Sequence, residues 1–166
     1  MTDYLDTLAN VEHEKSTSEY IVMRSISASG KSYASQSTKK HDFDGVDIVV
    51  INKEDHTEYT IDVKNSRNEN RNTTNFLFTV VNGLGKSYIT KKTDYIAFLN
   101  RDTSLGPNTV EIVYVKFDII KTIIEKHNLK LYQSKTYKLG KYVLIPKYIA
   151  RKYGQSRMWS NINVNK

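Results

Sequence analysis

The sequence predicts a single α/β domain over residues 1–166, with a central mixed β-sheet flanked by helices. A length of 166 residues suits one domain with its own core, and 39% hydrophobic with 26% charged residues is a globular composition. Apolar runs of strand length, such as IVVI at 48–51, occur along the chain together with helical periodicity, as in FDIIKTIIEKHN at 117–128. Strands and helices mixed in this order favour an α/β architecture.

The individual elements follow from hydrophobic periodicity and from clusters of polar turn residues. Apolar positions among acids predict an amphipathic helix near the N-terminus, and the segment NSRNENRNTTN is typical of a loop. In chain order we expect a helix over 3–15, a strand over 20–26, a basic loop over 27–40, strands over 46–52 and 57–64, a loop over 65–75, a strand or helix start over 76–81, strands over 93–100 and 110–115, a helix over 117–128, a strand over 141–146 and a basic helix from 147.

The net charge of +7 is distributed unevenly. From residue 126 to the end there are ten Lys and Arg residues and no Asp or Glu. Cations neutralise phosphates and aromatic rings stack on bases, so we favour a nucleic-acid partner over a solvated basic face. We therefore expect 126–166 to be a DNA-binding extension of a core over about 3–128. The aromatic residues among these cations are Tyr132, Tyr137, Tyr142, Tyr148, Tyr153 and Trp159.

Several classes of site are excluded by composition. The chain has no cysteine, which excludes disulfides, thiolate nucleophiles and cysteine zinc sites, and its four histidines have no metal-binding spacing. Its apolar runs are far shorter than the roughly 20 residues of a membrane span. The start, MTDYLDTLANVEHE, lacks the basic and apolar regions of a secretory signal. We expect a cytoplasmic protein with no membrane partner.

The segment GVDIVVINKEDHTEYTIDVKNS, residues 45–66, has the pattern of two strands joined by a polar turn. A turn centred between residues 54 and 55 would place Asp47 opposite Asp62, with side chains about 5 Å apart. Asp62 and Lys64 are two positions apart and therefore share one face, while the residues that alternate with them face the core. The sequence thus predicts two acids and a lysine together on one polar face.

Two carboxylates this close repel each other unless a cation lies between them. Mg²⁺ prefers oxygen ligands and accepts one or two carboxylates together with water and substrate phosphate, and we expect Mn²⁺ to substitute for it. The carbonyl of Val63 is a further candidate ligand, and Lys64 would position or deprotonate a water or stabilise charge on phosphorus. The alternative is an edge hairpin whose polar face carries a surface ion pair, worth about 0–1 kcal/mol.

With Asp47 heading one strand and Asp62-Val63-Lys64 ending the next, the chain resembles the PD-(D/E)xK nuclease superfamily. The motif covers about residues 44–66, and the order of elements is similar over about 3–128; Val46 stands where the motif has proline. The resemblance implies a restriction-endonuclease-like core and a magnesium-dependent DNA endonuclease that hydrolyses phosphodiester bonds. The compact form is similar to archaeal-type Holliday-junction resolvases and small phage endonucleases, which implies branched DNA as a candidate substrate and a homodimer.

The same resemblance implies roles for single residues. Asp47 and Asp62 would bind the metal, and Lys64 would assist the attacking water. Members of the superfamily often add a glutamate from the first helix. Glu12, Glu14 and Glu19 are the candidates, and we prefer Glu14 because it lies near the apolar stripe of the predicted helix.

We expect DNA phosphates to contact the two polar loops and the basic C-terminal segment. The predicted DNA-binding residues are Lys31, Lys39, Lys40, Ser66, Arg67, Arg71, Lys141, Lys147, Arg151 and Lys152. Two other functions remain compatible with the sequence. One is a nucleic-acid-binding protein on the same fold that does not cut, and the other is an interaction protein whose basic segment binds an acidic protein.

Overall fold

The computed structural model describes residues 18–36, 46–65, 74–81, 87–133 and 140–160. The predicted helix over 3–15 lies outside these residues. After a helical segment over 18–27, the chain forms β1 (Ser32–Gln36), β2 (Ile48–Asn52), β3 (Glu58–Asn65), β4 (Asn75–Val81), the 3-10 helix η2 (Tyr88–Thr90), β5 (Tyr95–Asn100), the 3-10 helix η3 (Thr103–Leu105), β6 (Val110–Lys116), α3 (Phe117–Lys126), β7 (Tyr132–Gln133), β8 (Lys141–Pro146), α4 (Lys147–Tyr153) and β9 (Gln155–Trp159).

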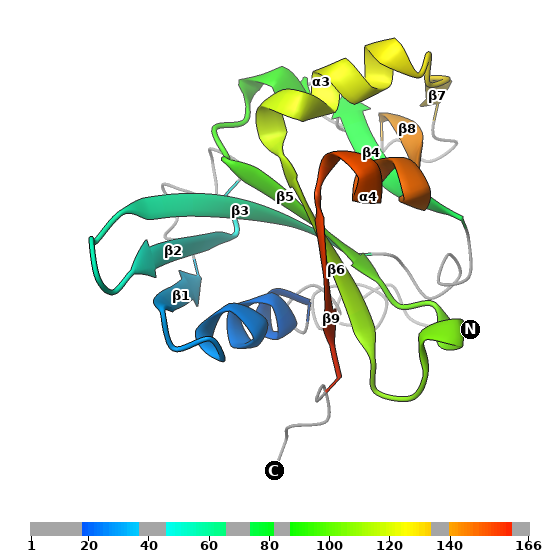
Figure 1. Cartoon of the computed structure of the whole chain (residues 1–166). Helices are drawn as coiled ribbons and strands as arrows, with labels where there is room; N and C mark the ends of the chain where they lie inside the picture. The colour runs from blue at the N-terminus through cyan, green and yellow to red at the C-terminus, as the bar shows by residue number, and fades with distance from the viewer. Residues whose placement is uncertain (1–17, 37–45, 66–73, 82–86, 134–139, 161–166) are drawn as a thin grey trace, which may run out of the picture.

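The strands form two sheets, which confirms an α/β fold with a mixed sheet. The larger sheet has six strands in the order β1-β2-β3-β5-β6-β9. Its β3–β5 pair is parallel, and its other neighbouring pairs are antiparallel. The smaller sheet, β4-β8-β7, is antiparallel. Figure 1 shows α3 and the smaller sheet on one side of the six-stranded sheet, and the helical segment 18–27 on the other.

Two hydrophobic cores lie on the two faces of the six-stranded sheet. In β5, Ile96 and Phe98 enter one core while Ala97 and Leu99 enter the other, so this central strand is apolar on both faces. We call the two clusters the α3 core and the 18–27 core. The α3 core joins the sheet to β4, β8, α3 and α4, for example through Phe78, Val143, Ile123 and Ile149; the 18–27 core joins it to the helical segment through Ile21 and Val22.

Two of the predicted elements are wrong. Residues 20–26 are helical rather than extended, because their buried positions have the helical spacing. Ser18, Ile21 and Val22 are buried and Ser25 and Ile26 are half-buried, at i, i+3, i+4, i+7 and i+8. Two of these positions are serines, so the hydrophobicity pattern of the sequence does not show a continuous apolar stripe. The β-branched Ile-Val pair then suggested a strand.

The predicted loop over 27–40 is wrong in its middle, where β1 pairs with β2. Its sequence SYASQ has too few apolar residues to show alternation, which is typical of an edge strand. The C-terminal segment supplies β8 to the smaller sheet and β9 to the other edge of the larger one, with α4 between them. The remaining predicted strands over 46–52, 57–64, 93–100, 110–115 and 141–146 and the helices from 117 and 147 are confirmed, with small shifts at their ends. Residues 76–81, predicted as a strand or the start of a helix, are a strand.

Candidate active site

The β2–β3 hairpin has the predicted register. Its pairs run from Ile48 opposite Ile61 to Ile51 opposite Glu58, as a turn centred between residues 54 and 55 requires. Asn52 Oδ1 holds this turn by accepting hydrogen bonds from the backbone N–H groups of residues 54 and 55, at 2.8 and 3.2 Å. A fixed turn fixes which side chains of the hairpin share a face.

Asp47 lies immediately before β2 and is held by β3. Its backbone N–H donates to the carbonyl of Ile61 at 2.9 Å, and its Oδ2 accepts the N–H of Val63 at 2.8 Å. Continuing the β2–β3 register by one residue sets Asp47 opposite Asp62, and Asp47 is among the groups that lower the pKa of Asp62. The structure therefore brings together the two acids that the sequence placed opposite each other.

Asp62 is buried, with 4% of its surface exposed. Its Oδ2 atom contacts two ammonium groups, Lys64 Nζ at 3.0 Å and Lys91 Nζ at 2.6 Å. The side chains of both lysines are 24% exposed, so the cluster reaches the surface through them rather than through the carboxylate. With Asp47, the cluster has two acids and two bases and a formal charge of zero.

Burial and charge act in opposite directions on these groups. Burial raises the pKa of Asp62, but the neighbouring Lys64 and Lys91 outweigh it and leave the pKa below its ordinary value. Burial lowers the pKa of Lys64, yet the attraction of Asp62 prevails and raises it. For Lys91, burial together with repulsion by Lys64 outweighs Asp62, so its pKa is lowered. The Asp62 carboxylate is therefore ionised at neutral pH.

Lys91 is the site residue that sequence reasoning missed. It follows η2 and precedes β5, and the parallel pairing of β3 with β5 sets Asp62 beside Ile96. A Lys-Lys pair just before an apolar strand was visible in the sequence at 91–92. Nothing in the local sequence, however, shows that this strand is the parallel neighbour of the strand carrying Asp62. The sequence therefore does not indicate that Lys91 lies at the site.

Aromatic rings of the α3 core lie next to the site. Lys64 pairs with Phe98 in the β3–β5 register, and its Nζ lies 5.9 Å from the centroid of the Phe78 ring. The rings of Phe78 and Phe98 meet edge to face, with centroids 6.4 Å apart. These rings provide apolar surroundings, which strengthen the attraction between Lys64 and Asp62 relative to that in water.

The described residues include carboxylates of the kind that a divalent cation binds. Asp47 and Asp62 provide the one or two carboxylates that Mg²⁺ commonly takes from protein. The described parts of the chain contain no group of three or more His, Cys, Asp or Glu residues that would hold a metal. Val63 touches the site through its N–H group, and metal ligation by its carbonyl stays a prediction.

The sequence offers three glutamates as candidates for a third carboxylate. Glu12 and the preferred Glu14 lie outside the described residues. Glu19 is part of the helical segment, and its Oε2 accepts a hydrogen bond from the side chain of Gln36 on β1 at 3.4 Å.

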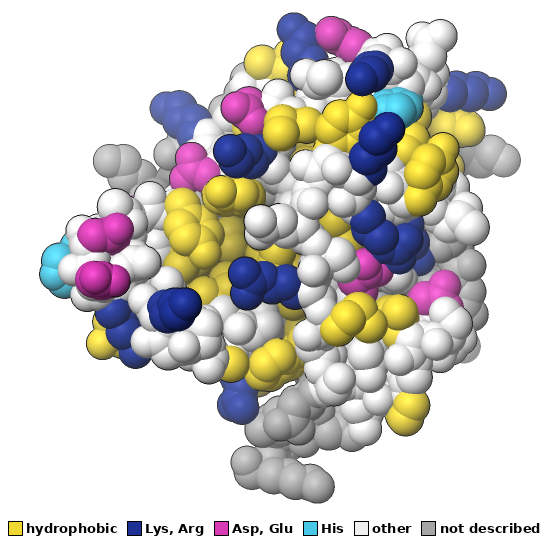
Figure 2. Space-filling model, viewed as in Figure 1, with side chains coloured by type: hydrophobic (Ala, Val, Ile, Leu, Met, Phe, Trp, Pro, Cys, Tyr) yellow, Lys and Arg dark blue, Asp and Glu magenta, His cyan; other side chains and the backbone are white. Residues whose placement is uncertain are grey.

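The predicted DNA-binding residues have different environments. Lys31, Lys141 and Lys152 are exposed, and DNA binding by them stays a prediction. Figure 2 shows Lys and Arg side chains spread over the viewed face among hydrophobic and acidic ones, rather than gathered in one continuous patch. The residues that lie outside the described part of the chain are Lys39, Lys40, Ser66, Arg67 and Arg71.

Two basic residues of α4 have internal partners instead. Lys147 is 5% exposed, and its Nζ donates to Asn100 Oδ1 at 2.8 Å. A buried ammonium group held in this way does not reach a DNA phosphate, so we no longer expect Lys147 to bind DNA. Arg151 forms a fork on the carboxylate of Glu111, with both N–O distances at 2.7 Å.

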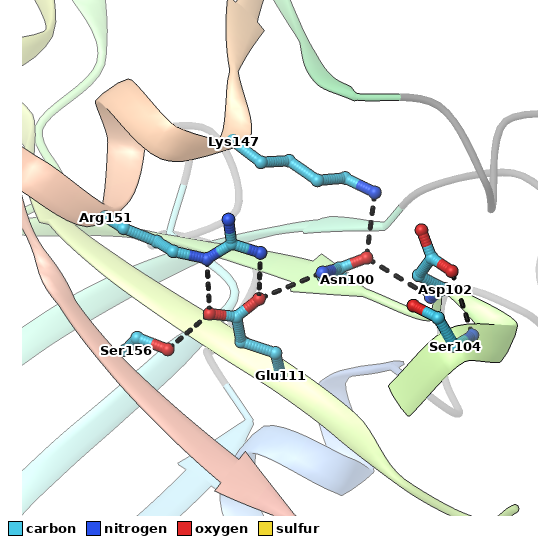
Figure 3. A network of polar contacts seen from close by, with 7 residues as sticks. All are labelled: Asn100, Asp102, Ser104, Glu111, Lys147, Arg151 and Ser156. Atoms are coloured by element: carbon cyan, nitrogen blue, oxygen red, sulfur yellow. Dashed lines mark hydrogen bonds and ion pairs between the residues drawn. The ribbon is translucent and has the colours of Figure 1, made fainter. Parts of the chain in front are cut away.

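These contacts belong to a second polar cluster, drawn in Figure 3. Buried Glu111 on β6 accepts hydrogen bonds from Arg151, from Asn100 Nδ2 at 2.9 Å and from the hydroxyl of Ser156 on β9. The hydrogen bonds from Arg151 are the main cause that lowers the pKa of Glu111 to about 2. The cluster joins α4 and β9 to the central strands, and its polar groups satisfy one another, as in a structural network.

Comparisons of the chain with protein-family models, with curated proteins and with solved structures find no match. In the described part of the chain, no helix is long and apolar enough to cross a membrane.

Proposed function

We propose that the protein is a magnesium-dependent DNA endonuclease with a PD-(D/E)xK-like site in a restriction-endonuclease-like core. One observation carries the proposal. Asp47 and Asp62 lie side by side at the head of one strand and near the end of the next, and Lys64 contacts Asp62 from the same face. Paired carboxylates with an adjacent lysine suit hydrolysis of a phosphodiester, in which water forms a bond to phosphorus and an ester P–O bond breaks.

The chain's own residues have distinct tasks in this reaction. Asp47, oriented by the N–H of Val63, and Asp62, oriented by Lys64 on the same strand, would hold the metal. A bound Mg²⁺ would supply a Lewis acid for the phosphate and lower the pKa of a water molecule. Lys64 would donate hydrogen bonds to the attacking water or to the phosphate oxygen on which charge develops. Cleavage of both strands of a branched or duplex substrate would require two copies of the chain.

The test is incubation of the full chain with four-way junction, flap, duplex and single-stranded DNA, with Mg²⁺, with Mn²⁺ and with chelator. We expect metal-dependent products from at least one substrate. Asp62→Asn should abolish cleavage while DNA binding persists. Glu58→Gln, which changes an exposed acid on the same strand, should cleave like the wild type. Undiminished cleavage by Asp62→Asn would refute the assignment.

The neutral charge balance of the cluster favours one alternative. Two ammonium groups already pair with Asp62, so its buried charge has partners without any metal. The alternative function is therefore nucleic-acid binding on the same fold without cleavage. Salt-sensitive DNA binding with no product from any substrate in either metal would support it.

A further inference from the structure

The backbone around Lys91 is fixed from both sides. On one side, the N–H of Lys91 donates to the carbonyl of Tyr88 at 2.9 Å. Tyr88 is itself buried, with its ring edge to face against Phe78 at a centroid distance of 5.4 Å. The start of the lysine side chain is therefore anchored to the aromatic part of the α3 core.

On the other side, Asp94 is bound to β3. Its Oδ2 accepts hydrogen bonds from the backbone N–H of Thr60 at 2.9 Å and from the Thr60 hydroxyl at 3.2 Å. The N–H of Asp94 donates back to the same hydroxyl at 3.0 Å. Thr60 is two positions before Asp62 on the same strand, so this exchange holds the segment carrying Lys91 beside the carboxylate that Lys91 contacts.

The ammonium group of Lys91 contacts a carboxylate oxygen of Asp62 that would otherwise be open to a cation. Asp62 Oδ2 receives Lys91 Nζ at 2.6 Å in addition to Lys64 Nζ at 3.0 Å, and the Asp62 side chain is only 6% exposed. A divalent cation that approaches this oxygen meets two positive charges. Lys64 belongs to β3, whereas Lys91 comes from a connecting segment.

We infer that Lys91 is the resident counter-ion of Asp62 and competes with a divalent cation for its carboxylate. This inference rests on the metal site of the proposed function. In the metal-free protein, Lys64 balances only one of the two carboxylate charges of Asp47 and Asp62. Lys91 balances the other. Metal binding requires its ammonium group to leave Oδ2, so Lys91 weakens metal affinity. Removing it changes the formal charge of the cluster from zero to −1 and increases attraction for a dication.

The experiment measures binding of Mn²⁺ to the full chain without DNA, by titration calorimetry and by the electron paramagnetic resonance of free Mn²⁺. Lys91→Met keeps most of the side chain and removes the charge. We expect it to bind Mn²⁺ about tenfold tighter than the wild type, or more. Lys92→Met removes an exposed charge at the next position and should alter affinity by less than about twofold, because exposed charges are screened.

A double variant tests whether Asp62 is the contested ligand. Adding Asp62→Asn to Lys91→Met should abolish the gain in affinity. Thermal unfolding checks that each variant is folded, and Lys91→Gln replaces Lys91→Met if the latter is not. The inference is overturned if neutral variants at position 91 bind Mn²⁺ no tighter than the wild type, or if the gain persists without Asp62.

The outcome is independent of the cleavage assay. Metal-dependent cleavage by the wild type, with unchanged Mn²⁺ affinity on loss of Lys91, would refute this inference and leave the nuclease proposal standing. A gain in affinity in a protein that cuts no DNA would establish the competition and refute the nuclease.

Discussion

Lys91 Nζ and Asp62 Oδ2 lie 2.6 Å apart, although 29 positions separate the two residues in the chain. The parallel pairing of β3 with β5 brings them together, because it places the segment before β5 beside β3. A parallel pair needs a long connection, so its two strands are distant in sequence. The candidate active site therefore combines a local hairpin with one residue supplied by the topology of the sheet.

If the protein cuts DNA as proposed, loss of Lys64 should slow cleavage strongly. Lys64→Met removes the ammonium group that lies 3.0 Å from Asp62, but it retains a stem that can cover the Phe78 ring. We expect the single-turnover rate in Mg²⁺ to fall about 100-fold or more, as for loss of a group that stabilises developing charge. The control is Lys53→Met, at an exposed lysine over the Tyr33 ring of β1, which should cleave normally. Equal rates for the two variants would exclude a chemical role for Lys64.

The hydrogen bonds between Asp94 and Thr60 should hold the segment that carries Lys91 in place. Asp94→Ala removes the acceptor of two hydrogen bonds at an exposed site, so the free energy of unfolding should fall by about 1 kcal/mol. Hydrogen exchange of the amides at 91–94 should accelerate relative to that of β6. Glu54→Ala, at an exposed acid of the hairpin turn, should change stability by less than about 0.5 kcal/mol. Unchanged exchange at 91–94 would contradict this role.

Glu111 should be a major determinant of stability. Glu111→Gln removes the buried charge on which Arg151 forks and leaves partly buried donors without an acceptor, so we expect the unfolding free energy to fall by about 2–4 kcal/mol. Urea unfolding measures the change. Glu58→Gln, an exposed acid in β3, should have little effect. A similar small effect at both positions would show that the network in Figure 3 contributes little.

The contribution of Glu111 should depend on pH in a defined window. Hydrogen bonds from Arg151 outweigh burial and lower the pKa of the folded state from 4.5 to about 2. Since the folded pKa is below the unfolded one, the carboxylate stabilises the fold above about pH 4.5, and this contribution is lost as pH falls through about 2. The difference in unfolding free energy between the wild type and Glu111→Gln should therefore shrink over that range. A difference that does not vary with pH would contradict it.

Gly154 should tolerate no side chain at the junction of α4 and β9. A Cβ atom there would collide with the carbonyl oxygen of Tyr114 and lie 2.9 Å from a methyl group of Val115 and 3.0 Å from the Ala150 carbonyl oxygen. We expect Gly154→Ala to lower the unfolding free energy by about 2 kcal/mol or more.

Gly30→Ala provides the matched control for Gly154→Ala. Its Cβ meets open space, and only the positive φ of 72° opposes it, which costs about 1 kcal/mol. Denaturant unfolding of both variants compares the two effects. A smaller loss at Gly154 than at Gly30 would show that β9 does not lie against β6 as described.

The sequence was most informative where side-chain pattern and turn chemistry act over short distances. Alternation and a polar turn predicted the β2–β3 hairpin and its register, and with them the meeting of Asp47 and Asp62 and the contact of Lys64 with Asp62. It was least informative at the sheet edges, where β1 and β9 are polar and largely exposed. It also misassigned 18–27, where buried Ser18 belongs to the apolar face of the helix.

The sequence by itself determined the α/β class, the hairpin and three polar residues of the candidate site, because these depend on neighbours within one hairpin. The tertiary structure alone decided the order of the strands, and strand order placed Lys91 at Asp62. It also decided which groups Lys147 and Arg151 contact. Their cationic groups looked available for phosphate in the sequence, but the packing of α4 against β6, β8 and β9 turns them toward Asn100 and Glu111. Burial is set by partners distant in the chain, so a lysine's sequence neighbours do not reveal whether its charge faces water or the core.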